Sequence, residues 1–379
     1  MRDFGNVKRV IIKIGSSSLV NKDLSINAEL FTSLCASLRS LRKMGVSPVI
    51  VTSGAVACGM HELGLSKRPK DMALKQACAA VGQAKLMESY NNFGQKEGLK
   101  FGQILVSHDD FQVRKRMLHL SNTFEAMFKS SIIPIINEND ALAVEEISVG
   151  DNDTLSALVT PMIRGDLLIL FSDIDGFYDK NPKKYEDAKL LSEIHDIDDN
   201  LLSMAMDSDS SVGTGGMKTK LHAAIISGYA CCNMIICNAD RINDICDIVR
   251  GEDIGSLFVA HPKEISGKDH FLIFNTNSSG AIFVDEGVET ALSQKRVSIL
   301  PKGVIGVRDE FLKGSVIDVV NKNGEIIAKG VTNFSSMEIK KLLGVSSQLV
   351  ESIVGYKCKN QIIHANDLVV LEKNYGILG

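Results

Sequence analysis

PIINENDALAVEEISVGDND, residues Pro134 to Asp153, is the stretch from which the organisation of this chain can be worked out. An apolar run over residues 132–136 is typical of a buried strand, and the chain turns polar immediately afterwards, over residues 137–140. A second polar cluster follows at residues 150–153. In an open α/β sheet, ligands bind beyond the carboxyl ends of the strands. These amides and carboxylates therefore suit a small ligand with an ammonium group or a metal-bound phosphate, although a solvated hairpin of turn-forming Asn and Asp also fits.

Two earlier strand ends carry small polar turns. The run VKRVIIKIG, residues 7–15, is nearly continuous in apolar residues, as in a strand covered on both faces, and Lys13 interrupts it just before a Gly-Ser turn. The run PVIVT, residues 48–52, leads into Ser53 and Gly54. Such turns can bring backbone N–H groups close to phosphate. An exposed loop with a solvent-directed lysine is the alternative, and the chain contains no Walker A sequence.

Strands and helices alternate through the first two thirds of the chain. We expect helices at residues 27–44, 72–93, 114–129, 153–163 and 240–249, and further strands at 101–107, 132–136, 167–171 and 233–237. This alternation predicts βαβ units and an α/β fold with a mainly parallel sheet.

Two later loops are candidates for binding a nucleotide. The loop SDIDGFYDKNP, residues 172–182, fails as a calcium loop because its fifth position is Phe177, so we expect it to hold a nucleoside. The stretch TGGMKTK, residues 214–220, leads into a helix that ends near Gly228. Glycines and lysines at a helix start favour anions, through free N–H groups, the helix dipole and cations. A flexible linker with chance lysines is the alternative.

The pattern changes from about Gly280, where strands become short and turns frequent. Short strands at 281–284, 297–299, 316–320 and 325–331, with helices at 288–294 and 336–343, predict a small β-rich barrel. We therefore expect a large domain over residues 1–262, a linker over 263–279 and a barrel domain over 280–373.

The composition excludes several classes of protein. The net charge of −4 gives no basic field for nucleic acid or anionic membrane. No apolar run approaches the ~20 residues that span a bilayer, and the N-terminal MRDFGNVKR lacks a signal-peptide core, so we expect a cytoplasmic protein. The 8 cysteines form no C-x-x-C pair and the 8 histidines have no metal spacing, which predicts reduced thiols and no zinc site.

Six stretches, taken in this order and spacing, resemble the glutamate 5-kinase family. They are KIGSS (13–17), VTSGAVA (51–57), INENDA (136–141), VGDNDTLSA (149–157), SDIDGFY (172–178) and TGGMKTK (214–220). Two later stretches, LPKGV (300–304) and AKGV (328–331), fit that family's C-terminal PUA domain. The resemblance covers nearly the whole chain. It implies an amino-acid-kinase fold, a three-layer sandwich around a mainly parallel sheet, followed by a PUA-like barrel.

The resemblance also implies a reaction, ATP- and Mg²⁺-dependent phosphorylation of the glutamate side-chain carboxylate to γ-glutamyl phosphate, and roles for individual residues. Lys13 and Lys220 would contact the transferring phosphoryl group, and Asp153 would position them. L-Glutamate would bind Ser53, Asp140 and Asn152, with Asp151 nearby. ATP would be held by Lys13, Ser172, Asp173, Thr214, Gly215, Gly216, Met217, Lys218, Thr219 and Lys220. Proline as a feedback inhibitor and a homo-oligomeric assembly are implied in the same way.

The proposed chemistry agrees with the residue types. A glutamate carboxylate has a pKa of ~4.3, so it is ionised at neutral pH and needs no general base. The difficulty is the approach of one anion to another, which lysines and Mg²⁺ on the phosphates offset. The sequence therefore predicts in-line transfer catalysed by positioning and electrostatics.

Two other functions fit parts of the sequence. Another enzyme of the same fold would act on acetylglutamate, aspartate, carbamate or a nucleotide, but the two polar clusters and the appended barrel favour free glutamate. An RNA-binding barrel would need a basic face, whereas residues 280–373 hold 12 Lys or Arg against 11 Asp or Glu. We therefore expect no nucleic-acid partner, and a structural or oligomerisation role for the barrel.

Overall fold

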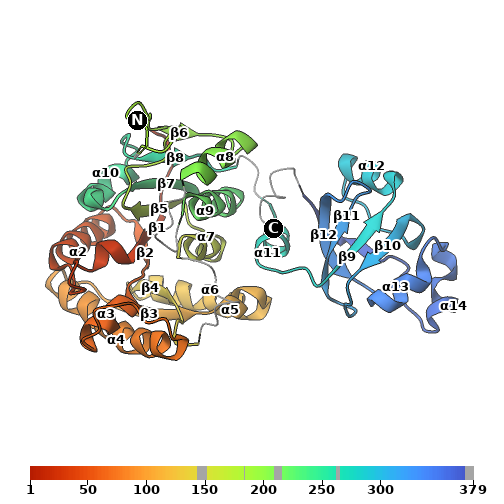
Figure 1. The fold of residues 1–379 in the computed structure, drawn as a ribbon, viewed down its shortest axis with the longest axis horizontal. Helices are drawn as coiled ribbons and strands as arrows, with labels where there is room; N and C mark the ends of the chain where they lie inside the picture. Colours follow the sequence, from red (N-terminus) through yellow and green to blue (C-terminus); the bar gives the residue numbers. More distant parts are fainter. Residues whose placement is uncertain (143–151, 183, 209–215, 262–264, 372–379) are drawn as a thin grey trace. The chain divides into compact units, whose positions relative to one another are not determined.

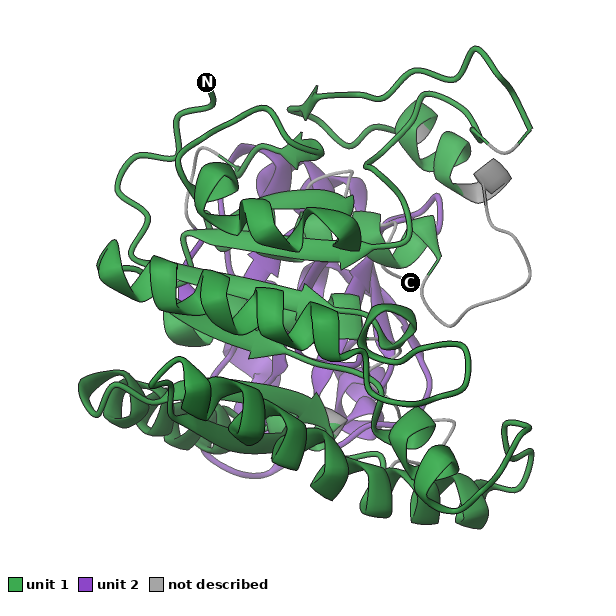
Figure 2. Ribbon diagram, turned by 90° about the vertical axis from the view of Figure 1, so that its left-hand side faces the viewer, with its two compact units in different colours: residues 1–264 green, residues 265–379 purple. Residues whose placement is uncertain are grey.

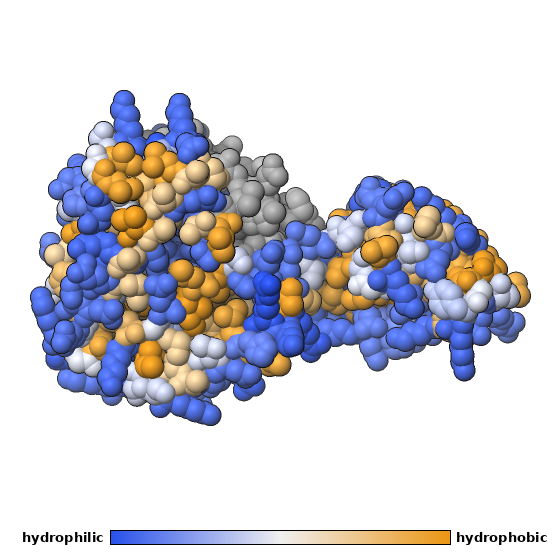
Figure 3. Space-filling model, turned by 90° about the horizontal axis from the view of Figure 1, so that it is seen from below, coloured by the Kyte–Doolittle hydropathy of each residue, from blue (hydrophilic) through white to orange (hydrophobic). Residues whose placement is uncertain are grey.

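The computed structural model describes residues 1–142, 152–182, 184–208, 216–261 and 265–371. The chain forms two compact units, Met1–Glu264 (unit 1) and Ile265–Gly379 (unit 2), which are coloured separately in Figure 2. Within the described residues, no helix combines the length and apolar character that crossing a membrane requires. The face drawn in Figure 3 accordingly mixes hydrophobic and hydrophilic side chains.

Unit 1 is built on an eight-stranded sheet with the strand order β3-β4-β2-β1-β5-β7-β8-β6. The neighbouring strands run parallel, except that β7 and β8 are antiparallel. The strands are β1 (Arg9–Ile14), β2 (Ser47–Val51), β3 (Phe101–Val106), β4 (Ile133–Glu138), β5 (Leu167–Ser172), β6 (Glu193–Ile194), β7 (Asn233–Asn238) and β8 (Ser256–Phe258). The predicted α/β fold with a mainly parallel sheet is therefore confirmed.

Helices cover both faces of this sheet, which gives three layers (Figure 1). The layer that contains α2 and α10 lies on one face, and the layer that contains α6, α7 and α9 lies on the other. The helices are α1 (Ser16–Leu19), α2 (Ala28–Lys43), α3 (Ala55–Glu62), α4 (Met72–Lys96), α5 (His108–Gln112), α6 (Arg114–Lys129), α7 (Asn152–Ile163), α8 (Asp199–Ser208), α9 (Met217–Tyr229), the 3₁₀ helix η1 (Ala239–Asp244) and α10 (Ile245–Val249). The helix expected at 240–249 is thus divided between η1 and α10.

Alternation along β1 decides which face receives Lys13. Val10, Ile12 and Ile14 belong to the core cluster that includes side chains of α2, α4 and α10. Because successive side chains of a strand point to opposite faces, Ile11 and Lys13 lie on the other face, where α7 and α9 pack. The alternation of side chains along β1 therefore directs Lys13 towards the first turns of α7 and α9.

Two glycines allow α3 and α4 to pack with their backbones in contact. A Cβ atom on Gly59 would lie 1.8 Å from the carbonyl oxygen of Cys78, and one on Gly82 would lie 1.8 Å from the carbonyl oxygen of Ala55. The sequence did not predict α3, which is short and follows directly from the turn at Gly54, where φ is +94°. This close crossing fixes the position of α4 relative to the end of β2.

Unit 2 has a five-stranded sheet with the order β10-β9-β11-β12-β13. Its strands are β9 (Ala281–Val284), β10 (Val304–Arg308), β11 (Val316–Val320), β12 (Ile326–Thr332) and β13 (Ile363–Val370). Its helices are α11 (Gly267–Phe274), α12 (Glu286–Gln294), η2 (Pro301–Gly303), α13 (Ser336–Leu342), η3 (Ser347–Leu349) and α14 (Val350–Val354). The strand expected at 297–299 is reduced to a single bridge between Ile299 and Ile363. Helix α11 lies in the stretch predicted to be a linker, and the domain boundaries stay a prediction.

We expect Gly82→Ala to destabilise unit 1, although glycine-to-alanine changes inside helices usually stabilise them by ~1 kcal/mol. The new methyl group would force α3 and α4 apart, which should lower the free energy of unfolding by about 2 kcal/mol. Denaturant unfolding followed by circular dichroism would measure this. Gly228→Ala is the matched control, because its Cβ would meet only the backbone nitrogen of His261, at 3.7 Å. Equal stability of the two variants would contradict the prediction.

Candidate active site

The site is organised around the carboxylate of Asp153, in the first turn of α7. Lys13 reaches it from β1, with 2.5 Å between Nζ and Oδ1, and Lys220 reaches it from α9, with 2.9 Å between Nζ and Oδ2. All three residues are buried, and Asp153 is 0% exposed. The structure therefore brings together the three residues that the sequence proposed for the phosphoryl group, although Asp153 and Lys220 are 67 positions apart.

Electrostatics keep Asp153 ionised. Burial alone would raise the pKa of this carboxyl group, but the charges and hydrogen bonds of Lys13 and Lys220 outweigh burial and lower the pKa below its ordinary value. Asp153 is therefore a poor proton acceptor and serves as a fixed negative charge between two ammonium groups. With both lysines charged, the three groups carry a net charge of +1, which suits an anion.

A second cluster, made of uncharged amides and hydroxyls, begins at the preceding residue, Asn152. Its Nδ2 atom donates to Ser53 Oγ at 2.6 Å, to the Thr52 carbonyl oxygen at 2.8 Å and to Asn137 Oδ1 at 3.2 Å. The polar ends of β2 and β4 thus meet the start of α7, as the strand-end argument predicted. Asn137 Nδ2 in turn donates to Gln83 Oε1 on α4, at 2.9 Å.

Asp140, expected to bind the substrate, is half-buried just beyond β4. Burial raises its pKa, while the positive charges of Lys75 and Arg68 act in the opposite direction. Both basic residues belong to α4 or the loop that leads into it. The segment before α4 therefore contributes charge to this side of the site, which the sequence alone did not indicate.

The residues proposed for the nucleotide lie along the ends of β5 and β7 and the start of α9. Ser172 ends β5 opposite Asn238 and donates to Asp173 Oδ1 at 3.1 Å. Helix α9 begins after Gly216, which offers no side-chain cap, and Thr219 Oγ1 donates to the Gly216 carbonyl. Met217 and Thr219 are half-buried and Lys218 is exposed in that first turn. Uncapped N–H groups and nearby lysines make this helix start suitable for phosphate.

Three of the proposed site residues, Asp151, Thr214 and Gly215, lie outside the described residues. Their proposed contacts with glutamate and ATP therefore stay predictions that rest on the family resemblance.

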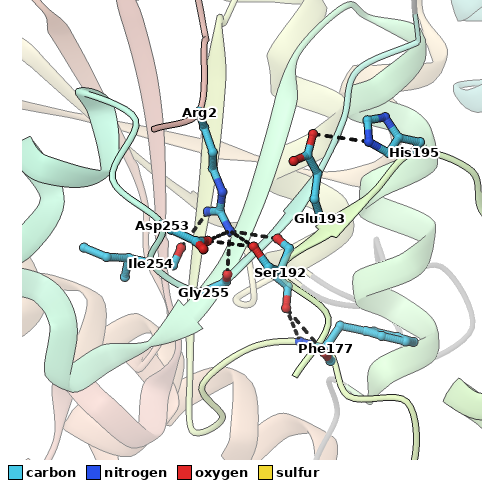
Figure 4. A network of polar contacts seen from close by, with 9 residues as sticks. Arg2, Phe177, Ser192, Glu193, His195, Asp253, Ile254 and Gly255 are labelled. Carbon is cyan, nitrogen blue, oxygen red and sulfur yellow. Dashed lines mark hydrogen bonds and ion pairs between the residues drawn. The ribbon is translucent and has the colours of Figure 1, made fainter. Parts of the chain in front are cut away.

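The N-terminal segment forms hydrogen bonds at the end of the sheet that contains β6 and β8 (Figure 4). The Arg2 guanidinium donates to residues of two adjacent segments: Ser192, Asp253, Ile254 and Gly255. The next residue along, Ser256, accepts a hydrogen bond at 2.7 Å from the backbone nitrogen of Phe177, in the loop after β5. Arg2 thus links the segments that precede β6 and β8, and Ser256 of β8 contacts the loop after β5.

Comparison with known proteins identifies the family of both units. The family model described as "Amino acid kinase family" matches residues 8–238, and the PUA domain model matches residues 280–354. A glutamate 5-kinase of Caldanaerobacter subterraneus subsp. tengcongensis is 40% identical over 96% of this chain and 98% of its own length. Glutamate 5-kinases of Carboxydothermus hydrogenoformans and Geobacter sulfurreducens are 41% and 40% identical, over 97% and 96% of this chain and 98% of their own lengths.

The chain belongs to the glutamate 5-kinase family. Membership confirms the predicted fold of a kinase domain followed by a PUA domain.

Gln83 is the site residue that sequence reasoning missed. It lies on the buried stripe of α4, among Ala79, Leu86 and Tyr90. The sequence predicted a helix over residues 72–93 but indicated no site residue on it. The available signal was the residue type, because Gln83 is an amide at a helix position where the helical period predicts an apolar side chain.

Replacing Asp153 by Asn should strongly destabilise unit 1. The change leaves two ammonium groups buried beside an uncharged amide, and removing one partner from a buried ion pair typically costs about 3–5 kcal/mol. Chemical denaturation would measure the loss. Asp187→Asn is the control, because Asp187 pairs with Lys180 at the surface and should contribute little. An Asp153→Asn protein as stable as the wild type would show that the lysines do not depend on this charge.

Proposed function

We propose that this chain transfers the γ-phosphoryl group of ATP to the side-chain carboxylate of L-glutamate and so forms γ-glutamyl phosphate, the first step of proline synthesis. The observation that carries the proposal is the buried Lys13–Asp153–Lys220 cluster, with its distances of 2.5 and 2.9 Å, beside an amide cluster of a different chemical character. The names of the curated relatives, which are about 40% identical over nearly the full chain, support the same reaction.

The charge of the cluster explains how the reaction proceeds without a general base. The attacking carboxylate is ionised at neutral pH, because its ordinary pKa is ~4.3. The lowered pKa of Asp153 makes this residue unsuitable as a base. Catalysis then consists of bringing two anions together and stabilising charge on the transferring oxygens, which Lys13 and Lys220 provide from opposite sides of one carboxylate.

We assign the two halves of the site to the two substrates. Ser53, Asn152 and Asp140 would bind glutamate, with Asp151 contributing from outside the described residues. ATP would lie along Lys13, Ser172, Asp173 and the segment from Thr214 to Lys220. The uncapped start of α9 supports the second assignment, because its N–H groups and the lysines on its first turns suit a polyphosphate.

Magnesium fits this arrangement as a partner of the nucleotide. Among the described residues, no group of three or more His, Cys, Asp or Glu side chains has the spacing of a metal site. Mg²⁺ is commonly bound through substrate phosphates and one or two carboxylates, and it keeps several waters. When bound, it would neutralise phosphate charge alongside the two lysines.

Proline as an inhibitor and a homo-oligomeric enzyme are implied by the family resemblance alone. We propose that proline binds at the glutamate end of the site, near Ser53 and Asp140, since both molecules are amino acids. Inhibition that is independent of glutamate concentration would argue against this overlap. Light scattering of the purified protein would test the oligomeric state, and a monomer at assay concentration would overturn that part of the proposal.

We expect Lys13→Met and Lys220→Met each to lower kcat by about 10²–10³-fold while the protein stays folded. Each variant removes one cation from the transferring phosphoryl group, but leaves Asp153 paired with the other lysine. Steady-state kinetics with a thermal melt would measure both effects. Lys340→Met, an exposed change in unit 2, is the control. Turnover close to that of the wild type in either variant would remove that lysine from the mechanism.

A coupled assay with glutamate, ATP and Mg²⁺, in which hydroxylamine traps the acyl phosphate as a hydroxamate, should show turnover with L-glutamate. ADP release, which reports phosphoryl transfer to any acceptor, should be much slower with acetylglutamate, carbamate and nucleoside monophosphates, which lack a free α-ammonium group, and with aspartate, whose side chain is one methylene shorter. Faster turnover with any of these alternatives would reassign the substrate within the same fold.

A further inference from the structure

A chain of three amides leads from α4 to the proposed glutamate site. Gln83 Oε1 accepts from Asn137 Nδ2 at 2.9 Å, and Asn137 Oδ1 accepts from Asn152 Nδ2 at 3.2 Å. Gln83 is 8% exposed and Asn137 is 1% exposed. The hydrogen bonds of these side chains are therefore formed inside the protein rather than with bulk water.

Backbone groups at two points determine which end of each amide faces which neighbour. The Thr52 carbonyl can only accept, so the atom of Asn152 that lies 2.8 Å from it must be the nitrogen. The backbone N–H of Glu138 can only donate, so the atom of Asn137 that it contacts at 3.0 Å must be the oxygen. The nitrogen of Asn137 must then face Gln83, which has to present its oxygen.

With the amides oriented in this way, one polar atom at each end of the three-amide chain has no hydrogen-bond partner among the described residues. Asn152 Oδ1 is buried and has no hydrogen-bond partner among the described residues. A carbonyl oxygen in that position accepts from an ammonium group and cannot serve a carboxylate. At the other end, Gln83 Nε2 is also buried without a partner among those residues.

The unpaired nitrogen indicates what Gln83 does. A methionine of similar size would remove this unpaired donor but would leave Asn137 Nδ2 as an unpaired buried donor in its place, so the exchange is close to neutral for stability. Among the contacts that the structure describes, the side chain of Gln83 hydrogen-bonds only to Asn137. Its presence therefore serves the orientation of Asn137 rather than the stability of the core.

The backbone of α4 gives Gln83 a fixed base. The neighbouring Gly82 lies in direct contact with the carbonyl of Ala55, where a Cβ atom would come within 1.8 Å. Ala55 starts α3, two residues after Ser53. Gln83 and Ser53, which lie at opposite ends of the amide chain, are thus held at a set distance by the crossing of α3 and α4.

We propose that Gln83 is a positioning residue for substrate selection, which acts through Asn137 to keep the amide oxygen of Asn152 directed at the ammonium group of the amino-acid substrate. This inference rests on the proposed function. A site built to hydrogen-bond a substrate N–H group strongly rejects an analogue that lacks it. Gln83 therefore contributes to the preference for L-glutamate over glutarate, which has the same two carboxylates and no amino group.

The test compares Gln83→Met with the wild type in the hydroxamate assay. We expect the KM for glutamate to rise about tenfold, because Asn137 loses its acceptor and Asn152 loses a fixed partner. The kcat and the KM for ATP should change by no more than about twofold, and the melting temperature should stay close to that of the wild type, because the substitution removes one unpaired buried donor, Gln83 Nε2, and creates another, Asn137 Nδ2. The ratio of kcat/KM for glutamate to that for glutarate should fall with the rise in KM.

Two further variants and one control separate positioning from a general structural role. Gln83→Glu keeps an acceptor for Asn137. At about pH 6 this variant should recover most of the glutamate affinity that Gln83→Met loses. Both variants are compared with the wild type at that same pH. In an Asn137→Ala background, Gln83→Met should have little further effect on KM, since both changes break the same chain. Gln95→Met, at an exposed position of the same helix, should behave as the wild type.

The outcomes that overturn the proposal are distinct. An unchanged KM for glutamate in Gln83→Met, fully additive effects of Gln83→Met and Asn137→Ala, or equal increases in both KM values with a lowered melting temperature would each reject a positioning role. If the wild-type protein fails to form hydroxamate from glutamate, the proposed function fails instead.

Discussion

The ion pairs of Asp153 are the interaction on which the rest of unit 1 depends. Two buried ammonium groups repel each other, and each would lose much of its hydration energy without compensation. One carboxylate, placed between them at 2.5 and 2.9 Å, makes it possible to hold both charges at one edge of the sheet. Residues that this cluster requires come from β1, α7 and α9, so the charge cluster also joins distant parts of the chain.

The topology explains why these three elements can meet. In a parallel sheet the carboxyl ends of the strands share one edge, and the helices that follow begin there. Because the side chains of β1 alternate between faces, Lys13 lies on the face covered by α7 and α9. Asp153 lies in the first turn of α7 and Lys220 in the first turn of α9, so both reach the same edge without any unusual backbone conformation.

Residue patterns alone indicated phosphate sites at Lys13, where polarity interrupts an apolar run, and at the helix start that contains Lys220, whereas the convergence of both lysines on Asp153 was implied by the family resemblance. Sequence patterns failed where structure depends on contacts between segments. The short helix α3 contains Gly59, whose role is to let α4 approach, and no local pattern reveals that approach. The strands β10 and β13 were missed because their pairing partners, β9 and β12, determine them more than their own residues do. Gln83 was missed because its partner, Asn137, lies 54 positions away.

In the proposed mechanism, adjacent residues at the start of α7 serve the two halves of the reaction. Asn152 turns to the amides and hydroxyls at the ends of β2 and β4, and Asp153 turns to the two lysines. Neighbouring side chains on a helix project in directions about 100° apart. The first turn of α7 would therefore set the distance between the bound glutamate carboxylate and the phosphate that approaches it. The neutral cluster can bind an ammonium group without attracting phosphate, and the charged cluster attracts phosphate without a proton acceptor. In the mechanism that we propose, the separation of these two chemistries by one residue would account for both the selection of the acid and the absence of a general base.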